Sequence, residues 1–111
     1  MQEIIDKYIE MNHFGRLLEM DFTILQAGKV EYYLTIQQKH LATTKVAHGG
    51  VISALTDAAL GVAALSAVAN DNKLVATIEF KINYLAPAFL NDKLLATGEV
   101  ISKGKRLLVA E

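Results

Sequence analysis

Cysteine is absent from this sequence of 111 residues, and neither sign of charge is in excess. Without cysteine the chain can form no disulfide framework, no thiolate nucleophile and no cysteine metal site. Eleven Lys and Arg against twelve Asp and Glu give a formal net charge of −1. We therefore expect no general attraction to nucleic acid or to an anionic membrane surface.

The features of a secretory signal are also lacking in the first 12 residues, which are amphipathic and have neither a basic end nor a continuous apolar run, so we expect no such signal here. We expect a cytoplasmic protein, with residues 1–111 forming one domain. A domain of about 110 residues buries roughly two-thirds of its unfolded surface. Since 52% of the residues are hydrophobic, we expect spare apolar surface and a homo-oligomer.

The first third of the chain predicts one helix and one β-hairpin. Helical spacing of apolar residues predicts a short amphipathic helix over residues 4–12, ending before Gly15. Alternation with period two predicts strands over residues 18–24 and 30–36. The Gly-containing turn at residues 27–29 makes them an antiparallel hairpin, and a loop is expected from residue 37 to 45.

Residues 50–69 form the most apolar stretch and predict a long buried helix, with Val51, Leu55, Ala58, Val62 and Leu65 on one stripe. Its length is near the roughly 20 residues that cross a membrane. A central Asp costs about 2.5–3.5 kcal/mol on insertion scales, and this stretch has few large apolar residues to offset that cost. We therefore expect a core helix and no membrane contact.

The last third predicts three strands. The clearest alternation runs over residues 74–84 and breaks at residues 86–88; it is followed by a strand over 93–101, a turn at 102–105 and a strand over 107–110. Short turns between successive strands predict a mostly antiparallel sheet. One buried helix lying across such a sheet is an α+β arrangement.

The start of the long helix has the features of a site for a developing anion. Gly49 and Gly50 follow His48, where a helix normally has a Ser, Thr, Asp or Asn cap. Uncapped N–H groups at a helix N-terminus can stabilise an oxyanion. The alternative is a loop that needs glycine for positive φ. His48 would brace this loop or orient a substrate carbonyl.

Asp57 is the only charged residue between His48 and Asp71. A carboxylate on a buried helix is costly unless it has a partner, so Asp57 is either a reactive acid or a solvent-facing or interface residue with a structural partner. His13 and His40 lack ligand spacing, and we expect no metal site.

Asp57 lies eight residues after Gly49, which is ~12 Å along a helix axis. The attacking group and the oxyanion donor must both lie about 3 Å from one carbonyl group. One helix cannot place both there, but two antiparallel copies can. We therefore expect a site shared across a two-fold dimer interface, two sites to a dimer.

The segment HGGVISALTDAALGVAA, with an acid nine positions after His48, resembles the signature of the hotdog-fold acyl-CoA thioesterases of the phenylacetic-acid-degradation type. The segments TIEFKINYLAPA and VISKGKRLLVAE extend the resemblance over most of the chain. It implies a hotdog fold, in which a curved antiparallel sheet wraps the long helix. It also implies homodimers joined edge to edge, which often pair into tetramers.

The resemblance implies that Asp57 acts as general base or nucleophile, that the Gly49 N–H polarises the thioester carbonyl, and that His48 supports the loop. Gly50 would contact substrate and the Thr77 hydroxyl would position water. Coenzyme A, as part of the substrate, would lie at the subunit interface; no separate cofactor is implied. Its phosphates would lie near Lys103, Lys105 and Arg106.

The sequence departs from the family pattern in two places. Ala42 stands where some relatives have an Asn that assists the carbonyl, and family members usually add a strand beyond Glu111, so we expect a sheet without its last strand. Three other functions stay open: an acyl-CoA or lipid binder without catalysis, a structural oligomer, and a dehydratase or hydratase. The last needs a His and acid pair at a different spacing, which this chain does not have.

Overall fold

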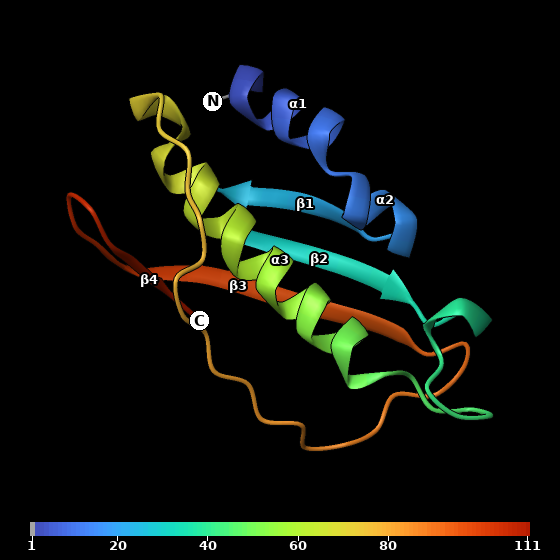
Figure 1. The fold of residues 1–111 in the computed structure, drawn as a ribbon. Coiled ribbons are helices and arrows are strands. Elements are labelled where there is room, and N and C mark those ends of the chain that lie inside the picture. The colour runs from blue at the N-terminus through green and yellow to red at the C-terminus, as the bar shows by residue number, and fades with distance from the viewer. Residues whose placement is uncertain (1) are drawn as a thin grey trace.

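The computed structural model describes residues 2–111, and their arrangement confirms the α+β class. The helices and strands, shown in Figure 1, are α1 (Gln2–Met11), α2 (His13–Leu18), β1 (Asp21–Gln26), β2 (Lys29–Thr35), α3 (Gly49–Val68), β3 (Lys93–Lys103) and β4 (Leu108–Ala110). Two short 3-10 helices cover Gln38–His40 and Ala69–Asp71.

The four strands form one antiparallel sheet in the order β1-β2-β3-β4. The β1–β2 turn depends on Gly28, whose φ of 86° is unfavourable for other residues. The central pair joins distant parts of the sequence, with Tyr32 opposite Ala96. α3 lies across one face of the sheet, as Figure 1 shows, so the expected central helix is confirmed.

The core lies between α3 and the two central strands. Val51, Leu55 and Val62 on α3 are buried with Val30 and Leu34 on β2. By length and composition alone, the helical stretch Gly49–Asp71 would also pass as a membrane span. In the fold, its buried stripe packs on the sheet, which is the behaviour of a core helix.

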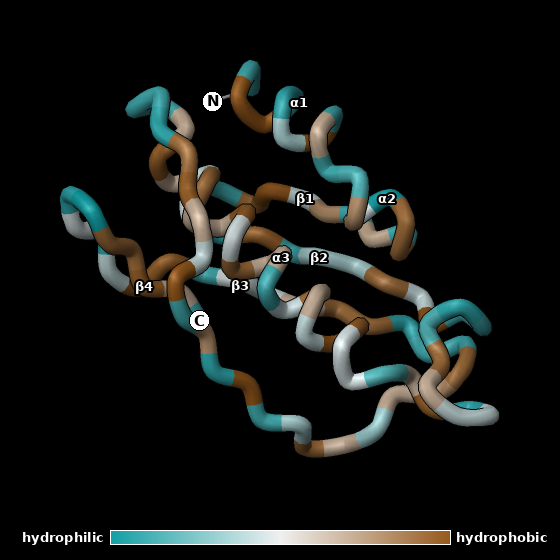
Figure 2. Tube along the Cα trace, viewed as in Figure 1, coloured by the Kyte–Doolittle hydropathy of each residue, from teal (hydrophilic) through white to brown (hydrophobic). Residues whose placement is uncertain are grey.

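The strand predicted over residues 74–84 is wrong, because this segment is extended but pairs with no strand among residues 2–111. Leu74 is 76% exposed, Ile78 81% and the following Leu85 94%. Figure 2 shows hydrophobic and hydrophilic residues alternating along it. Alternation predicts an extended backbone, but a strand also needs a neighbour for its N–H and C=O groups.

The hairpin prediction is confirmed, although its first strand begins at Asp21 rather than at residue 18. Residues 13–18 instead form α2, whose first turn is capped by the Asn12 side chain accepting the Gly15 N–H at 3.1 Å. This local cap decides the boundary, because it gives α2 a start signal that period-two alternation ignores.

Gly98 on β3 is where α3 approaches the sheet most closely among the described glycines. A Cβ at Gly98 would lie 2.5 Å from the Ala59 carbonyl oxygen of α3. We expect Gly98→Ala to push α3 away and to destabilise the fold by about 1–3 kcal/mol. In a domain of this size each kcal/mol lowers the melting temperature by about 4–8 °C, so a thermal melt should show a melting temperature roughly 10 °C below that of the wild type.

The control for this prediction is Gly61→Ala in α3, where an added Cβ meets no heavy atom within 4 Å. Since glycine inside a helix is less stable than alanine by roughly 0.5–1 kcal/mol, this variant should melt at a higher temperature. A Gly98→Ala protein that melts with the wild type would contradict the close approach.

Candidate active site

The start of α3 is capped by the ring of His48. His48 is the N-cap residue, with φ −64° and ψ 136°, and its Nδ1 accepts the Gly50 N–H at 2.8 Å. The expectation that both glycines lack a side-chain cap is therefore wrong, because an imidazole nitrogen can accept in place of a hydroxyl or carboxylate oxygen. The Gly49 N–H, in contrast, has no hydrogen-bond acceptor among residues 2–111.

The alternative reading of the glycine pair, a loop that needs positive φ, is also wrong. Of the described glycines, Gly28 is the one with positive φ. Gly49 and Gly50 are the first two residues of α3. The helix start thus offers one free amide, at Gly49, where the helix dipole favours negative charge.

Asp57 lies on the same helix, half-buried, and has one hydrogen-bond donor among the described side chains. Thr77 Oγ1, 20 residues further along the chain, donates to Asp57 Oδ1 at 2.9 Å. The extended segment 74–84 thus places the Thr77 hydroxyl on the carboxylate. Since Asp57 keeps its second oxygen without a protein donor, that oxygen can accept from a water molecule or reach a substrate.

Gly49 and Asp57 both belong to α3, eight residues apart. The rise of an α-helix separates them by ~12 Å along its axis. The free amide and the carboxylate of one chain therefore cannot contact the same carbonyl group.

Two residues beside Gly49, Tyr84 and Ser53, were missed in the sequence. The Tyr84 ring would lie 3.4 Å from a Cβ at Gly49, so it covers one side of the free amide. The Tyr84 hydroxyl is in hydrogen-bond contact with Ser53 Oγ, one turn into α3. Alternation gave Tyr84 only the role of a strand residue, and no sequence signal placed it over the helix start.

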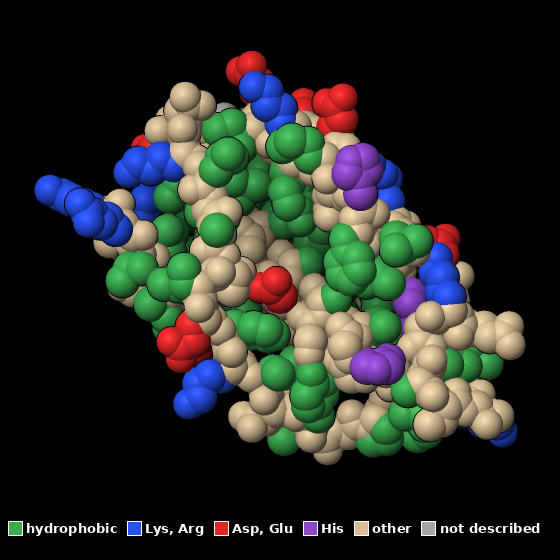
Figure 3. Space-filling view, in the orientation of Figure 1, with side chains coloured by type: hydrophobic (Ala, Val, Ile, Leu, Met, Phe, Trp, Pro, Cys, Tyr) green, Lys and Arg blue, Asp and Glu red, His purple; other side chains and the backbone are tan. Residues whose placement is uncertain are grey.

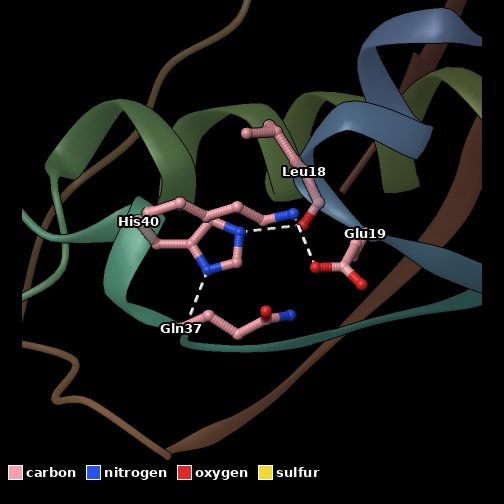
Figure 4. Close-up of polar contacts among 5 residues, drawn as sticks. Leu18, Glu19, Gln37 and His40 are labelled. Carbon is pink, nitrogen blue, oxygen red and sulfur yellow. Dashed lines mark hydrogen bonds and ion pairs between the residues drawn. The ribbon is translucent and has the colours of Figure 1, made fainter.

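His40 holds the loop that leads into α3. Its ring is 1% exposed; Nδ1 accepts the Gln37 N–H at 2.8 Å and Nε2 donates to the Leu18 carbonyl at 2.8 Å, as Figure 4 shows. The His40 carbonyl accepts the His48 N–H at 2.8 Å. His40 thus connects the end of α2 to the residue that caps α3. Its buried position, at the end of a single turn of 3-10 helix, carries no periodic signal in the sequence.

Two groups, Glu19 and Tyr32, have shifted pKa values, and both take part in contacts that hold the fold together. The pKa of Glu19 is lowered, first by its hydrogen bond from Lys39, whose Nζ lies 2.5 Å from Glu19 Oε2. Burial raises the pKa of Tyr32, whose hydroxyl accepts from Asn12 Nδ2 at 3.2 Å. The Asn12–Tyr32 bond joins the α1–α2 junction to β2, and the Lys39–Glu19 pair joins the end of α2 to the 3-10 helix Gln38–His40.

The predicted basic residues lie at the other end of α3 from Gly49. Lys103 Nζ donates to the Ala67 carbonyl at 2.9 Å and to Asp71 Oδ2 at 3.2 Å, where a cation suits the helix C-terminus. Lys105 and Arg106 are exposed in the β3–β4 turn. Within one chain these residues and Gly49 are separated by almost the full length of a 20-residue helix, ~30 Å.

The described residues contain no group of three or more His, Asp or Glu side chains that could hold a metal ion.

Ala42, in the loop before His48, is exposed and donates its N–H to the Val46 carbonyl at 2.8 Å. The polar groups around the helix start are therefore the Gly49 amide, the His48 ring and the Tyr84 and Ser53 hydroxyls.

Comparison with known proteins identifies the family. The model of the thioesterase superfamily matches residues 44–111. The chain is 33% identical over 96 residues to 1,4-dihydroxy-2-naphthoyl-CoA thioesterase 2 of Arabidopsis thaliana, covering 86% of this chain and 60% of that protein. It is 26% identical over 109 residues to human acyl-coenzyme A thioesterase 13, covering 96% of this chain and 76% of that one.

Among solved structures, the Escherichia coli PaaI protein from the phenylacetic acid degradation operon has a TM-score of 0.86. It is 24% identical, with 96% of this chain and 74% of that chain covered, and the likeness shows a shared fold. Of two curated relatives, from Archaeoglobus fulgidus and Arabidopsis thaliana, the chain spans 59% and 60% of the length. The family match extends from the loop before His48 to Glu111, and this chain belongs to the thioesterase superfamily, with its hotdog fold.

Proposed function

We propose that this protein hydrolyses acyl-CoA thioesters at a site shared between two copies of the chain. The observation that carries the proposal is a pair of groups on α3. The Gly49 amide is free at the start of the helix, and the Asp57 carboxylate, two turns further along, accepts a hydrogen bond from Thr77. An oxyanion donor and a general base are what acyl transfer to water requires.

In the proposed reaction, Asp57 accepts a proton from water as the water oxygen attacks the thioester carbonyl carbon. The Thr77 hydroxyl, which donates to Oδ1 at 2.9 Å, fixes the carboxylate and leaves Oδ2 for the water. The Gly49 N–H stabilises the oxyanion of the tetrahedral intermediate. The carbon–sulfur bond then breaks, the proton passes to the departing thiolate, and the products are a carboxylic acid and free coenzyme A.

Direct attack by Asp57 on the carbonyl carbon is the second route for the same residue. It would form a mixed anhydride and break the carbon–sulfur bond, with coenzyme A leaving as the thiolate. Water would then hydrolyse the anhydride, which restores the Asp57 carboxylate, gives the carboxylic acid and supplies the proton that the thiolate takes up. Both routes need the Asp57 carboxylate and the Gly49 amide at one carbonyl group.

A second chain supplies the missing half. If two α3 helices lie antiparallel, the Gly49 end of one is beside Asp57 of the other, and the ~12 Å separation within a chain is bridged. The exposed apolar residues of segment 74–85 supply surface for such contact. The same arrangement brings the Lys105 and Arg106 turn of one chain toward the helix start of the other, where coenzyme A phosphates would lie.

The experiment is a hydrolysis screen. The purified protein is incubated with acetyl-, octanoyl-, palmitoyl- and phenylacetyl-CoA, and free thiol is followed with a thiol-reactive dye. We expect thiol release from at least one substrate. If an acyl-CoA raises the melting temperature of the protein but no thiol is released, the protein is instead a binder of acyl-CoA without catalysis. The exposed methyl group of Ala42, where some relatives have an amide, favours this second function.

A further inference from the structure

We propose that a cavity between α1 and α3 binds the acyl chain of the thioester, and that Gly61 sets how long a chain it accepts. This inference rests on the proposed thioesterase function and assigns its substrate class, an apolar acyl group of medium length.

The cavity has a volume of about 540 Å³ and opens beside Asp57. Hydrophobic side chains line the hollow between the two helices in the space-filling view (Figure 3). The lining residues come from α1, α3 and the segment after α3, and they include Lys7, Met11, Asp57, Gly61, Leu65 and Thr77. This volume falls in the range of roughly 300–1,000 Å³ that is usual for small-molecule sites.

The lining of the cavity is charged at few positions and otherwise mostly apolar, which suits the apolar acyl group of a thioester. Asp57 is its single carboxylate and Lys7 its single cation, while most other lining residues are apolar. The carboxylate and Thr77 mark where the carbonyl group would lie. An apolar chain would run away from them, because its burial against the apolar lining is favourable and a charged or sugar substituent would lose its hydration there.

The α3 face sets the length available. Asp57, Gly61 and Leu65 line the cavity at intervals of four residues, so they share one helix face. Gly61 is ~6 Å and Leu65 ~12 Å beyond Asp57 along the helix axis. A medium-chain acyl group fits this distance.

Gly61 lacks a packing reason to be glycine. Glycine in the middle of a helix costs roughly 0.5–1 kcal/mol relative to alanine. At Gly98 the Ala59 carbonyl lies so close that there is no room for a side chain. At Gly61, in contrast, an added Cβ meets no heavy atom within 4 Å. The space that the missing side chain leaves is the cavity itself, one helical turn past Asp57.

The test measures how chain length controls kcat/KM. Gly61→Ala and Gly61→Leu are compared with the wild type on acetyl-, octanoyl- and palmitoyl-CoA. We expect the ratio of kcat/KM for octanoyl-CoA to kcat/KM for acetyl-CoA to fall at least about tenfold in Gly61→Leu. The ratio in Gly61→Ala should lie between those of the wild type and Gly61→Leu. The change is steric, so acetyl-CoA should be affected least.

A second pair of variants tests the opposite wall. Met11 lines the cavity from α1 and is 62% exposed, whereas Ile9, 48% exposed on the same helix, lines a different hollow. Met11→Ala should widen the cavity and raise the ratio for palmitoyl-CoA over octanoyl-CoA several-fold. Ile9→Ala, the matched control, should keep the wild-type ratio.

The outcomes separate this inference from the function on which it rests. A wild type that hydrolyses no acyl-CoA overturns the proposed function. A wild type that is active while Gly61→Leu keeps its octanoyl to acetyl ratio, or loses all substrates equally, overturns the acyl site alone. If Gly61→Leu fails to fold, the Met11 and Ile9 pair decides, and equal ratios in those two variants overturn the site.

Discussion

The Asp57→Asn variant is expected to lose at least about a hundredfold in kcat on whichever acyl-CoA the wild type hydrolyses. Asparagine has the shape of aspartate but can neither take a proton from water nor attack a thioester. Its Oδ1 still accepts the Thr77 hydroxyl, which lies 2.9 Å away in the wild type, so the segment after α3 should stay in place. Steady-state thiol release gives kcat, while light scattering and a thermal melt show whether assembly and fold persist.

A matched control changes the same chemistry elsewhere. Asp21 on β1 is exposed, and its Oδ1 accepts the Phe22 N–H at 2.8 Å, a bond that an amide oxygen can keep. Asp21→Asn should therefore hydrolyse substrate at the wild-type rate. Hydrolysis by Asp57→Asn at the rate of this control would remove Asp57 from the mechanism.

Gly49→Pro is expected to reduce kcat by about 10²–10³-fold, the usual effect of deleting one oxyanion donor. Proline lacks the N–H that has no acceptor among residues 2–111. Gly49 is the first residue of α3, the position at which helices accept proline best. His48 has ψ 136°, the extended conformation that a residue before proline needs, so the fold should tolerate the change.

The control for this variant is Gly49→Ala, which keeps the N–H and adds a Cβ 3.4 Å from the Tyr84 ring. Its kcat should stay within about threefold of the wild type if the amide, rather than the open space at Gly49, does the chemistry. Equal losses in the alanine and proline variants would contradict the role of the amide.

Co-expression of the two inactive variants tests the shared site. In a mixed dimer, an antiparallel arrangement places both lesions in one site and leaves the other site with a native Gly49 and a native Asp57. Activity should therefore return in the mixture although each parent variant lacks it. No recovery in a mixture shown to contain mixed dimers would mean that each chain carries its own complete site.

Much of this architecture was predictable because it is local. Alternating residues predict the β1–β2 hairpin, and Gly28 marks its turn with a φ of 86°. The apolar stripe through Val51, Leu55 and Val62 predicts the buried face of α3. Each pattern reflects a backbone period that neighbouring residues set by themselves.

The surroundings of the site were less predictable because they depend on contacts between distant segments. The alternation of residues 74–84 indicates a strand, yet the segment pairs with none among residues 2–111 and instead brings Thr77 to Asp57 and Tyr84 to Gly49. The role of His40 was equally hidden, since its ring connects positions 22 residues apart.

The sequence by itself determined that an amide donor and a carboxylate stand on one helix, ~12 Å apart, because a fixed rise for each residue turns sequence spacing into distance. Tertiary structure alone decided that His48 caps Gly50 and leaves the Gly49 amide free, and that Thr77 reaches Asp57. It also decided that a cavity opens between α1 and α3 beside Gly61. These features depend on which side chains meet across the fold, and hydrophobic periodicity carries no information about such meetings.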